Sequence, residues 1–185
     1  CDADIEFVGA RKESYSADSR NPIVENGTLE DDQNRRDFTI NTLAVSLNKN
    51  IFGQLIDIFN GLDDIKNGII KTPVDPQITF NDDPLRILRA FRFASQLSFT
   101  VHKDILLAAQ NLVNRLEIIS QERITEELLK ILASPTPSIG LKYLYNTGVM
   151  KFVFPEIAVL GGVEQINKHH PHPHRSSYLC GCTKT

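Results

Sequence analysis

The chain has 185 residues, of which 41% are hydrophobic and 23% are charged, enough to bury a core as one large or two small domains. No apolar run approaches the length of a membrane span and no signal peptide is recognisable, so we expect no membrane partner. Cysteine occurs only as Cys1, Cys180 and Cys182, which predicts no disulfide framework and favours a cytoplasmic location, where thiols stay reduced.

The net charge of −3 is unevenly distributed along the chain. Residues 1–75 carry 8 Lys and Arg against 14 Asp and Glu, whereas residues 76–185 carry 12 against 9. A surface that binds RNA is therefore expected in the second part. Mildly basic helical domains are common, so this balance alone does not identify a function.

The first 75 residues predict short strands joined by loops. Ile5–Val8 reads as a strand, with Glu6 between apolar neighbours. Residues 16–34 are rich in Asp, Asn, Ser and Gly and predict a surface loop. Two more strands are predicted over Leu55–Phe59 and Gly68–Thr72, with a short helix between them over Gly61–Ile65.

A helix is expected to begin near Asn34, with Phe38, Leu43 and Ala44 on its buried side. Its polar residues are Arg35, Arg36, Asp37 and Asn41. Adjacent arginines near a helix start can bind a triphosphate, and a nearby Asp or Asn can hydrogen-bond a ribose hydroxyl. A solvated charged turn has the same composition, so both interpretations stay open at this point.

Pro73, Asp75 and Pro76 interrupt this pattern and predict a domain boundary, with a first domain over 1–75 and a second over 76–165. The second domain is expected to be a small helical bundle, because three further segments show helical periodicity. These segments are Val101–Leu116, Gln121–Ala133 and Ser138–Asn146.

The central helix of the second domain is expected to follow Asp82-Asp83-Pro84, with Pro84 in its first turn and Asp82 or Asp83 as its cap. Its apolar residues predict a broad buried face, while its arginines recur every third residue as a basic stripe. The apolar residues are Leu85, Leu88, Phe91, Phe93, Ala94 and Leu97, and the arginines are Arg86, Arg89 and Arg92.

Asp83 and Arg86 are three residues apart and would be neighbours on this helix. A carboxylate accepts and a guanidinium donates, so the pair could read a base edge, attracting the amino groups of C and A and repelling the carbonyls of U and G. The alternative is an N-cap with an intrahelical salt bridge, which the spacing alone favours.

Residues 166–185 predict an irregular tail that is not part of a native domain. Histidines alternate with prolines over His169–His174, and Cys180 and Cys182 follow. We expect no physiological metal site there, because histidines on an irregular strand do not fix a coordination geometry.

Three of these segments, in this order, resemble the class II tRNA nucleotidyltransferase and bacterial poly(A) polymerase family, whose best-known members are CCA-adding enzymes. They are Arg35–Ala44, Leu55–Ile65 and Asp83–Phe93, and the resemblance spans roughly residues 4–166. It implies an α+β fold, in which part of a nucleotidyltransferase head precedes an all-helical neck. It also implies transfer of C and A from CTP and ATP to the 3′ end of tRNA, with Mg²⁺ as cofactor.

The resemblance also implies roles for individual residues. Glu6 matches the third acidic residue of the polymerase site, and a larger set is implied to bind the nucleotide: Arg35, Arg36, Asp37, Asn41, Asp82, Asp83, Arg86 and Arg89. Asp82 stands where the family usually has Glu, and Thr42 where it usually has Ala. The family's Gly-Gly turn and Asp-x-Asp strand have no counterpart before Glu6, so we expect an amino-terminally truncated fragment that is inactive alone.

Other functions share these motifs. A poly(A) polymerase, or an enzyme that adds only A or only CC, is one alternative. A helical module that binds RNA without catalysis is another, and it would show salt-dependent tRNA binding without nucleotide incorporation.

Overall fold

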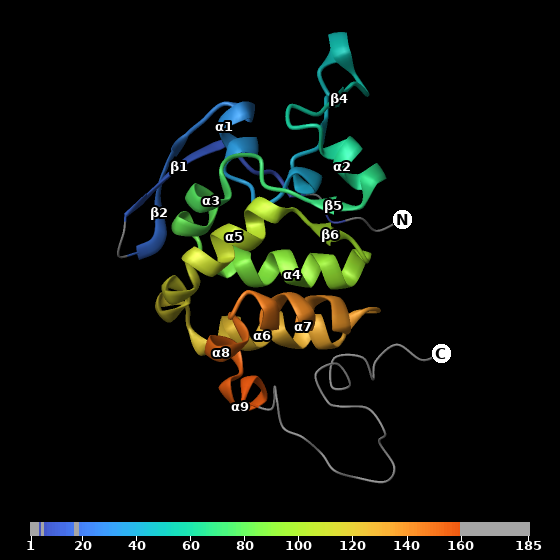
Figure 1. Ribbon diagram of the computed structural model, residues 1–185. Helices are drawn as coiled ribbons and strands as arrows, with labels where there is room; N and C mark the ends of the chain where they lie inside the picture. Colours follow the sequence, from blue (N-terminus) through green and yellow to red (C-terminus); the bar gives the residue numbers. More distant parts are fainter. Residues whose placement is uncertain (1–3, 5, 17–18, 160–185) are drawn as a thin grey trace.

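The computed structural model describes residue 4 and residues 6–16 and 19–159, which are drawn as the coloured ribbon in Figure 1. The expected α+β class is confirmed: short two-stranded sheets occupy the first part and helices the second. In the described part of the chain, no helix is long and apolar enough to cross a membrane. The expected tail over 166–185 lies outside the described residues.

The first part begins with a hairpin and a short helix. β1 (Arg11–Ser16) pairs antiparallel with β2 (Ser19–Asn26), and α1 (Leu29–Asn34) follows. Thr28 and Asp31 form a reciprocal capping box that starts α1. The loop expected over residues 16–34 is therefore wrong, because hairpin pairing and this cap order much of the polar segment. Residues 6–10 lie outside any strand, contrary to the expected strand at Ile5–Val8.

The helix expected to begin near Asn34 is also wrong, because α1 ends at that residue. Phe38 is extended, and a 3₁₀ turn over Thr39–Asn41 follows. Thr39 donates its N–H to the carbonyl of Lys71 at 2.8 Å and its hydroxyl to Asp64 at 2.6 Å. These bonds to residues distant in sequence replace the helical ladder that local periodicity suggests.

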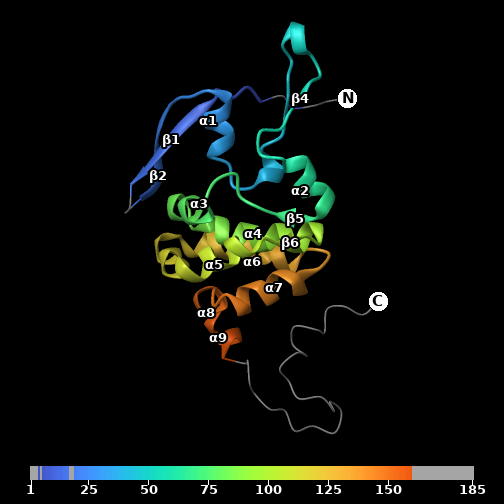
Figure 2. The ribbon, with the colours of Figure 1, turned by 45° about the horizontal axis from the view of Figure 1, so that its top comes forward.

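A second hairpin and a crossover complete the first part. β3 (Ala44–Val45) pairs with β4 (Leu55–Ile56), and this hairpin projects from the body in Figure 2. α2 (Gly61–Asn67) is capped by Asp57, whose oxygens accept the N–H groups of Gly61 and Leu62 at 2.7 and 2.9 Å. β5 (Ile69–Ile70) then pairs parallel with β6 (Thr100–Val101).

The second part is helical, and α4 (Leu85–Leu97) lies in its middle in Figure 1. α4 packs against α6 (Gln121–Leu132) and α7 (Pro137–Asn146), and α3 (Pro76–Asp82) contacts both α4 and α5 (Lys103–Asn111). A 3₁₀ segment over Val113–Ile118 replaces the end of the helix expected over Val101–Leu116. Two short helices follow, α8 (Met150–Val153) and α9 (Pro155–Ala158).

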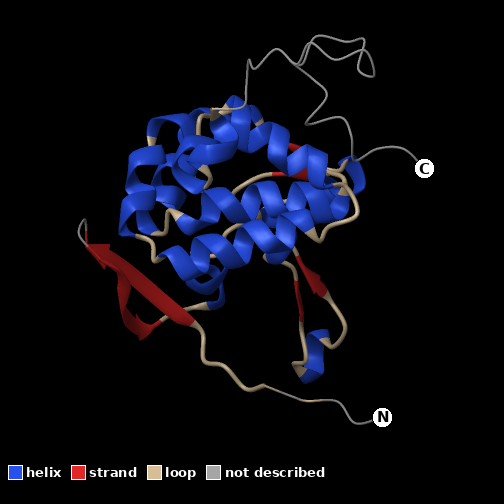
Figure 3. Ribbon diagram, turned by 90° about the horizontal axis from the view of Figure 1, so that it is seen from below, coloured by secondary structure: helices blue, strands red, loops and turns tan. Residues whose placement is uncertain are grey.

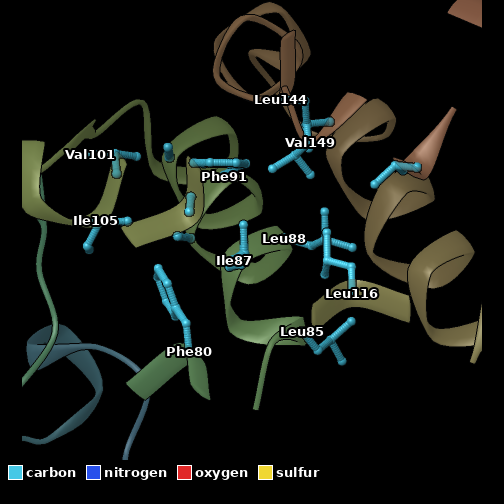
Figure 4. Close-up of a cluster of buried hydrophobic side chains, with 14 of the residues drawn as sticks. Phe80, Leu85, Ile87, Leu88, Phe91, Val101, Ile105, Leu116, Leu144 and Val149 are labelled. Carbon is cyan, nitrogen blue, oxygen red and sulfur yellow. The ribbon is translucent and has the colours of Figure 1, made fainter. Parts of the chain in front are cut away.

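The core surrounds α4, as Figure 4 shows. Ile87 and Phe91 of α4 are fully buried, together with Phe80 of α3, Ile105 of α5 and Leu144 of α7. Burying each such side chain contributes roughly 1.5–3 kcal/mol. The expected buried face of α4 is found at Leu85, Leu88, Phe91 and Ala94, Phe93 is partly buried, and Leu97 at the helix end is exposed.

α7 approaches α4 closely at Gly140. A Cβ there would clash with the hydroxyl of Ser95 and the carbonyl of Phe91, and the Gly140 N–H donates to Ser95 Oγ at 2.8 Å. Glycine is therefore needed at this helix contact.

The two parts share this core, although Figure 3 shows both hairpins extending from one side of the helical body. Phe38 and Ile70 from the first part are fully buried in the same cluster as α4. Phe38 packs edge-on against Phe93, with ring centroids 5.7 Å apart. Pro76 begins α3, with Asp75 as its cap, and the division into domains at residue 75 stays a prediction.

Candidate functional site

A cavity of about 490 Å³ lies where the segment after α1 meets the start of α4 and the first turn of α6. It gathers seven of the nine residues that the sequence singled out, together with Leu85 and Arg123. The seven are Arg35, Arg36, Asp37, Asn41, Asp83, Arg86 and Arg89. Most of these side chains are charged, so the cavity suits a charged, polar ligand.

Asp37 links the two sides of the cavity. Its Oδ2 accepts bonds from Arg89 Nε at 2.8 Å and Nη2 at 2.6 Å, and its Oδ1 accepts from Asn41 Nδ2 at 2.9 Å. Asp37 is only 7% exposed, so the carboxylate of this pair between the first part and α4 is shielded from solvent, while the Arg89 side chain stays partly exposed.

Asp32 of α1 holds both adjacent arginines. Its Oδ1 accepts from Arg35 Nε at 2.9 Å, and its Oδ2 accepts from Arg36 Nη2 at 3.0 Å. Burial by itself would raise the pKa of Asp32, but the bonds and charges of the two guanidinium groups outweigh it and hold the pKa below its usual value. Arg35 also contacts Glu13 of β1 at 3.0 Å. Both arginines are therefore oriented before any ligand binds.

Asp83 and Arg86 lie together at the start of α4 but do not pair in the part of the chain that the structure describes. Asp83 Oδ1 accepts the N–H of Leu85 at 3.2 Å, so it caps the helix as expected, and its Oδ2 has no partner among the described residues. Arg86 donates to the carbonyl of Arg35 at 2.7 Å and to that of Thr79 at 3.4 Å. The predicted cap is thus present, and the intrahelical salt bridge of the alternative interpretation is not formed.

Two of the singled-out residues lie outside the cavity lining. Asp82 is half-buried at the end of α3, where burial first, and then the charges of Glu13 and Asp83, raise its pKa above the usual value. Glu6 is exposed in an irregular segment. Within residues 4, 6–16 and 19–159, no three His, Cys, Asp or Glu side chains come close enough to hold a metal ion.

The basic stripe of α4 divides between two environments. Arg86 and Arg89 line the cavity, whereas Arg92 turns to α6 and pairs with Glu127 at 3.0 Å. Burial lowers the pKa of Arg92, although the charge of Glu127 opposes this effect. The arginines recur every third residue, so they rotate around the helix and cannot all share one surface.

Sequence reasoning missed Arg123. It lies on α6, 30 residues beyond Phe93 at the end of the α4 motif, and it enters the lining only because α6 packs against α4. The one local signal was a cation in the first turn of a helix, where the helix dipole favours an acidic residue.

Two protein-family models match the chain. "Poly A polymerase head domain" matches residues 1–71, and "Probable RNA and SrmB- binding site of polymerase A" matches residues 98–160. A tRNA nucleotidyltransferase of Schizosaccharomyces pombe is 40% identical over 157 residues, which is 83% of this chain and 32% of the relative. A CCA-adding enzyme of Streptococcus gordonii is 41% identical over 152 residues, which is 81% of this chain and 37% of the relative.

Solved structures agree with these relatives. The apo form II of a CCA-adding enzyme superposes with a TM-score of 0.72 at 35% identity, covering 80% of this chain and 35% of that one. Other similar structures are CCA-adding enzymes in complex with CTP, with ATP, or with tRNA. The chain spans about a third of the length of the relatives it matches. It belongs to the tRNA nucleotidyltransferase and poly(A) polymerase family.

Proposed function

We propose that the intact protein adds C and A nucleotides to the 3′ end of tRNA, using CTP and ATP and releasing pyrophosphate. The observation that carries this proposal is the cavity itself. It combines an acceptor and donors at the start of α4 with two adjacent arginines on the opposite side. A nucleotide needs both, because its base is read by hydrogen bonds and its phosphates are neutralised by cations.

Asp83 and Arg86 select the base in this proposal. Asp83 Oδ2 is an acceptor without a protein partner in the described region, and Arg86 uses only two of its five donors, both in bonds to backbone carbonyls of Thr79 and Arg35. An amino group beside a ring acceptor, as in C and A, satisfies this pair. The carbonyl that U and G present at the amino position would face a carboxylate and be repelled.

Arg35 and Arg36 bind the triphosphate, and Asp37 with Asn41 binds the ribose. The two arginines already share Asp32, so less rotamer entropy is lost when phosphate oxygens arrive. Asp37 already holds Asn41 and Arg89, so the sugar would meet a network that connects to the base-selecting helix. We assign Asp82 and Arg89 to the same nucleotide site, as the residues that support Asp83 and Asp37.

Mg²⁺ belongs to the proposal for the intact protein only. Nucleotidyl transfer needs a cation that neutralises the leaving pyrophosphate. The described residues do not assemble a set of carboxylates that fits it, and exposed Glu6 alone would not hold it. The chain's own contribution, as proposed here, is binding and selection of the nucleotide.

The test is an Asp83→Ala substitution in the intact protein, assayed with each of the four nucleoside triphosphates on tRNA that lacks its terminal CCA. Loss of the carboxylate should relax the choice of base, so that incorporation of U or G rises relative to C and A. Asp104→Ala, which changes an exposed carboxylate on α5, serves as the control. An unchanged preference for C and A in the Asp83 variant would defeat the base-selection proposal.

A poly(A) polymerase is the second candidate, because both matching family descriptions name that enzyme. Assays with CTP and ATP separately, on tRNAs ending before and within the CCA sequence, distinguish full CCA addition from addition of A alone or CC alone. Salt-dependent tRNA binding without incorporation would instead indicate a module that only binds RNA.

We also propose a cytoplasmic site of action. Relatives described as mitochondrial exist in two yeasts, so cell fractionation is the direct test.

A further inference from the structure

Arg123 is the single lining residue of the cavity contributed by α6. Its side chain is exposed and has no hydrogen-bond or ion-pair partner among the described residues. It thus differs from the other arginines around the cavity, each of which has at least one protein acceptor.

The other arginines that line the cavity already have acceptors within the protein. Arg35 and Arg36 share Asp32, Arg89 is bound to Asp37, and Arg86 donates to two backbone carbonyls. With Asp32, Glu13 and the neighbouring Asp82 included, the site has five guanidinium groups against five carboxylates. Arg123 therefore adds a positive charge that offsets one of these carboxylates, and its donors are not already used by a protein acceptor.

Packing of α6 holds Arg123 at the cavity. Glu127 lies one helical turn after Arg123 and is locked to Arg92 of α4 in a buried pair at 3.0 Å. Ile124 and Ile131 of α6 are buried in the common core. The backbone that carries Arg123 is therefore fixed relative to α4, and only its side chain is free to reach a ligand.

The helix dipole does not favour an arginine at this position. The first turn of α6 carries the positive end of the helix dipole, which disfavours a cation there. An anionic ligand in the cavity would reverse this repulsion, because it would interact favourably with the guanidinium group.

We propose that Arg123 is a phosphate-binding residue, which rests on the nucleotidyl-transfer function proposed above. A planar guanidinium can donate two parallel hydrogen bonds to phosphate oxygens. The phosphate belongs either to the incoming nucleoside triphosphate or to the 3′ end of the RNA. Arg123 thereby extends the site from the first part of the chain and α4 to the helical bundle.

The test measures dissociation constants of CTP, ATP and CCA-lacking tRNA by calorimetry for the intact protein and three variants. Arg123→Gln removes the charge, Arg123→Lys keeps it, and Lys142→Gln removes an exposed cation of α7 outside the cavity. We expect Arg123→Gln to raise the dissociation constant of the ligand that Arg123 contacts about tenfold. Arg123→Lys should recover part of that lost affinity, and Lys142→Gln should bind like the wild type.

The three ligands distinguish the two phosphate sources. Weaker binding of CTP and ATP assigns Arg123 to the triphosphate. Weaker binding of tRNA assigns it to the RNA end, and the slope of log K against log salt should then decrease in magnitude by about 0.7, as for one lost single-strand phosphate contact. A purely structural role would not change this slope.

Unchanged affinity of Arg123→Gln for all three ligands, with an unchanged melting temperature, would overturn this inference. The proposed function is judged separately, from nucleotide incorporation by the wild-type protein. A wild type that incorporates no nucleotide, combined with weaker binding by Arg123→Gln, would refute the function and leave the phosphate-binding inference standing.

Discussion

The two sides of the cavity are built by different forces. On the side contributed by the first part, from Arg35 to Asn41, Phe38 is buried in the core, but the charged side chains are held by hydrogen bonds and ion pairs to Asp32 and Asp37. The side contributed by α4 is held by apolar packing against α3, α6 and α7. The β3–β4 hairpin carries exposed apolar side chains such as Leu47 and Phe52, whereas Ile87 and Phe91 of α4 are fully buried.

This difference separates stability from ligand contact. Most of the buried apolar area surrounds α4, so the helical part should determine the free energy of unfolding. The polar side should instead determine how the phosphates and the sugar are held, because its charged groups are organised but partly exposed. Substitutions on the two sides should therefore have effects of different size and kind.

The largest effect is expected for Phe91→Ala. Phe91 is fully buried and stacks on Tyr143 with ring centroids 5.6 Å apart, so truncation should lower the free energy of unfolding by about 3–5 kcal/mol. Phe52→Ala is the matched control on the β3–β4 hairpin, where Phe52 is 73% exposed and a change within about 0.5 kcal/mol is expected. Urea denaturation measures both free energies of unfolding. Equal losses in the two variants would contradict the proposed difference between the two parts.

An intermediate effect is expected for Asp32→Asn, which removes the carboxylate shared by Arg35 and Arg36. We expect a loss of roughly 1–2 kcal/mol, because one of the two guanidinium groups is substantially exposed. The KM for CTP and for ATP should rise together, without a change in the preference between bases. The measurements are urea denaturation and steady-state kinetics of the intact protein.

Asp63→Asn is the control for this prediction. Asp63 pairs with Lys66 at 3.3 Å on the exposed face of α2, so its loss should cost at most about 0.5 kcal/mol. A shift in base preference caused by Asp32→Asn would contradict the division of roles between the two sides.

The smallest effect is a pH dependence with opposite signs at two carboxylates. The pKa of Asp32 is lowered in the folded protein, so its contribution to stability is present above the unfolded pKa near 3.9 and is lost as the pH falls through the folded pKa. The pKa of Asp82 is raised, so ionising it in the folded state costs stability as the pH rises. Asp82→Asn should therefore stabilise the protein slightly at neutral pH.

Urea denaturation between pH 3 and 7 checks this last prediction. The acid-side decrease in stability should be smaller in Asp32→Asn than in the wild type. Destabilisation by Asp82→Asn at neutral pH would show that hydrogen bonding, rather than burial of charge, dominates at Asp82.

Local sequence predicted the helical part well. The helices predicted over Gln121–Ala133 and Ser138–Asn146 correspond to α6 and α7 within one residue at each end, and the apolar spacing of α4 predicts most of its buried face. It predicted the first part poorly, because β2 consists of a polar segment and the residues after Asn34 are held by Thr39 bonds to Lys71 and Asp64. Such partners are distant in sequence, so periodicity does not reveal them.

The sequence by itself determined the kinds of residue in the candidate site, since seven of the nine that it singled out line one cavity. Charge and hydrogen-bonding capacity belong to the side chain and can be read without coordinates. Only the tertiary structure decided the partners of these side chains. Arg89 pairs with Asp37, Arg92 pairs with Glu127 outside the cavity, and Arg123 of α6 joins the cavity lining. The physical reason is that these contacts depend on how α4 packs against its neighbours, which no local pattern encodes.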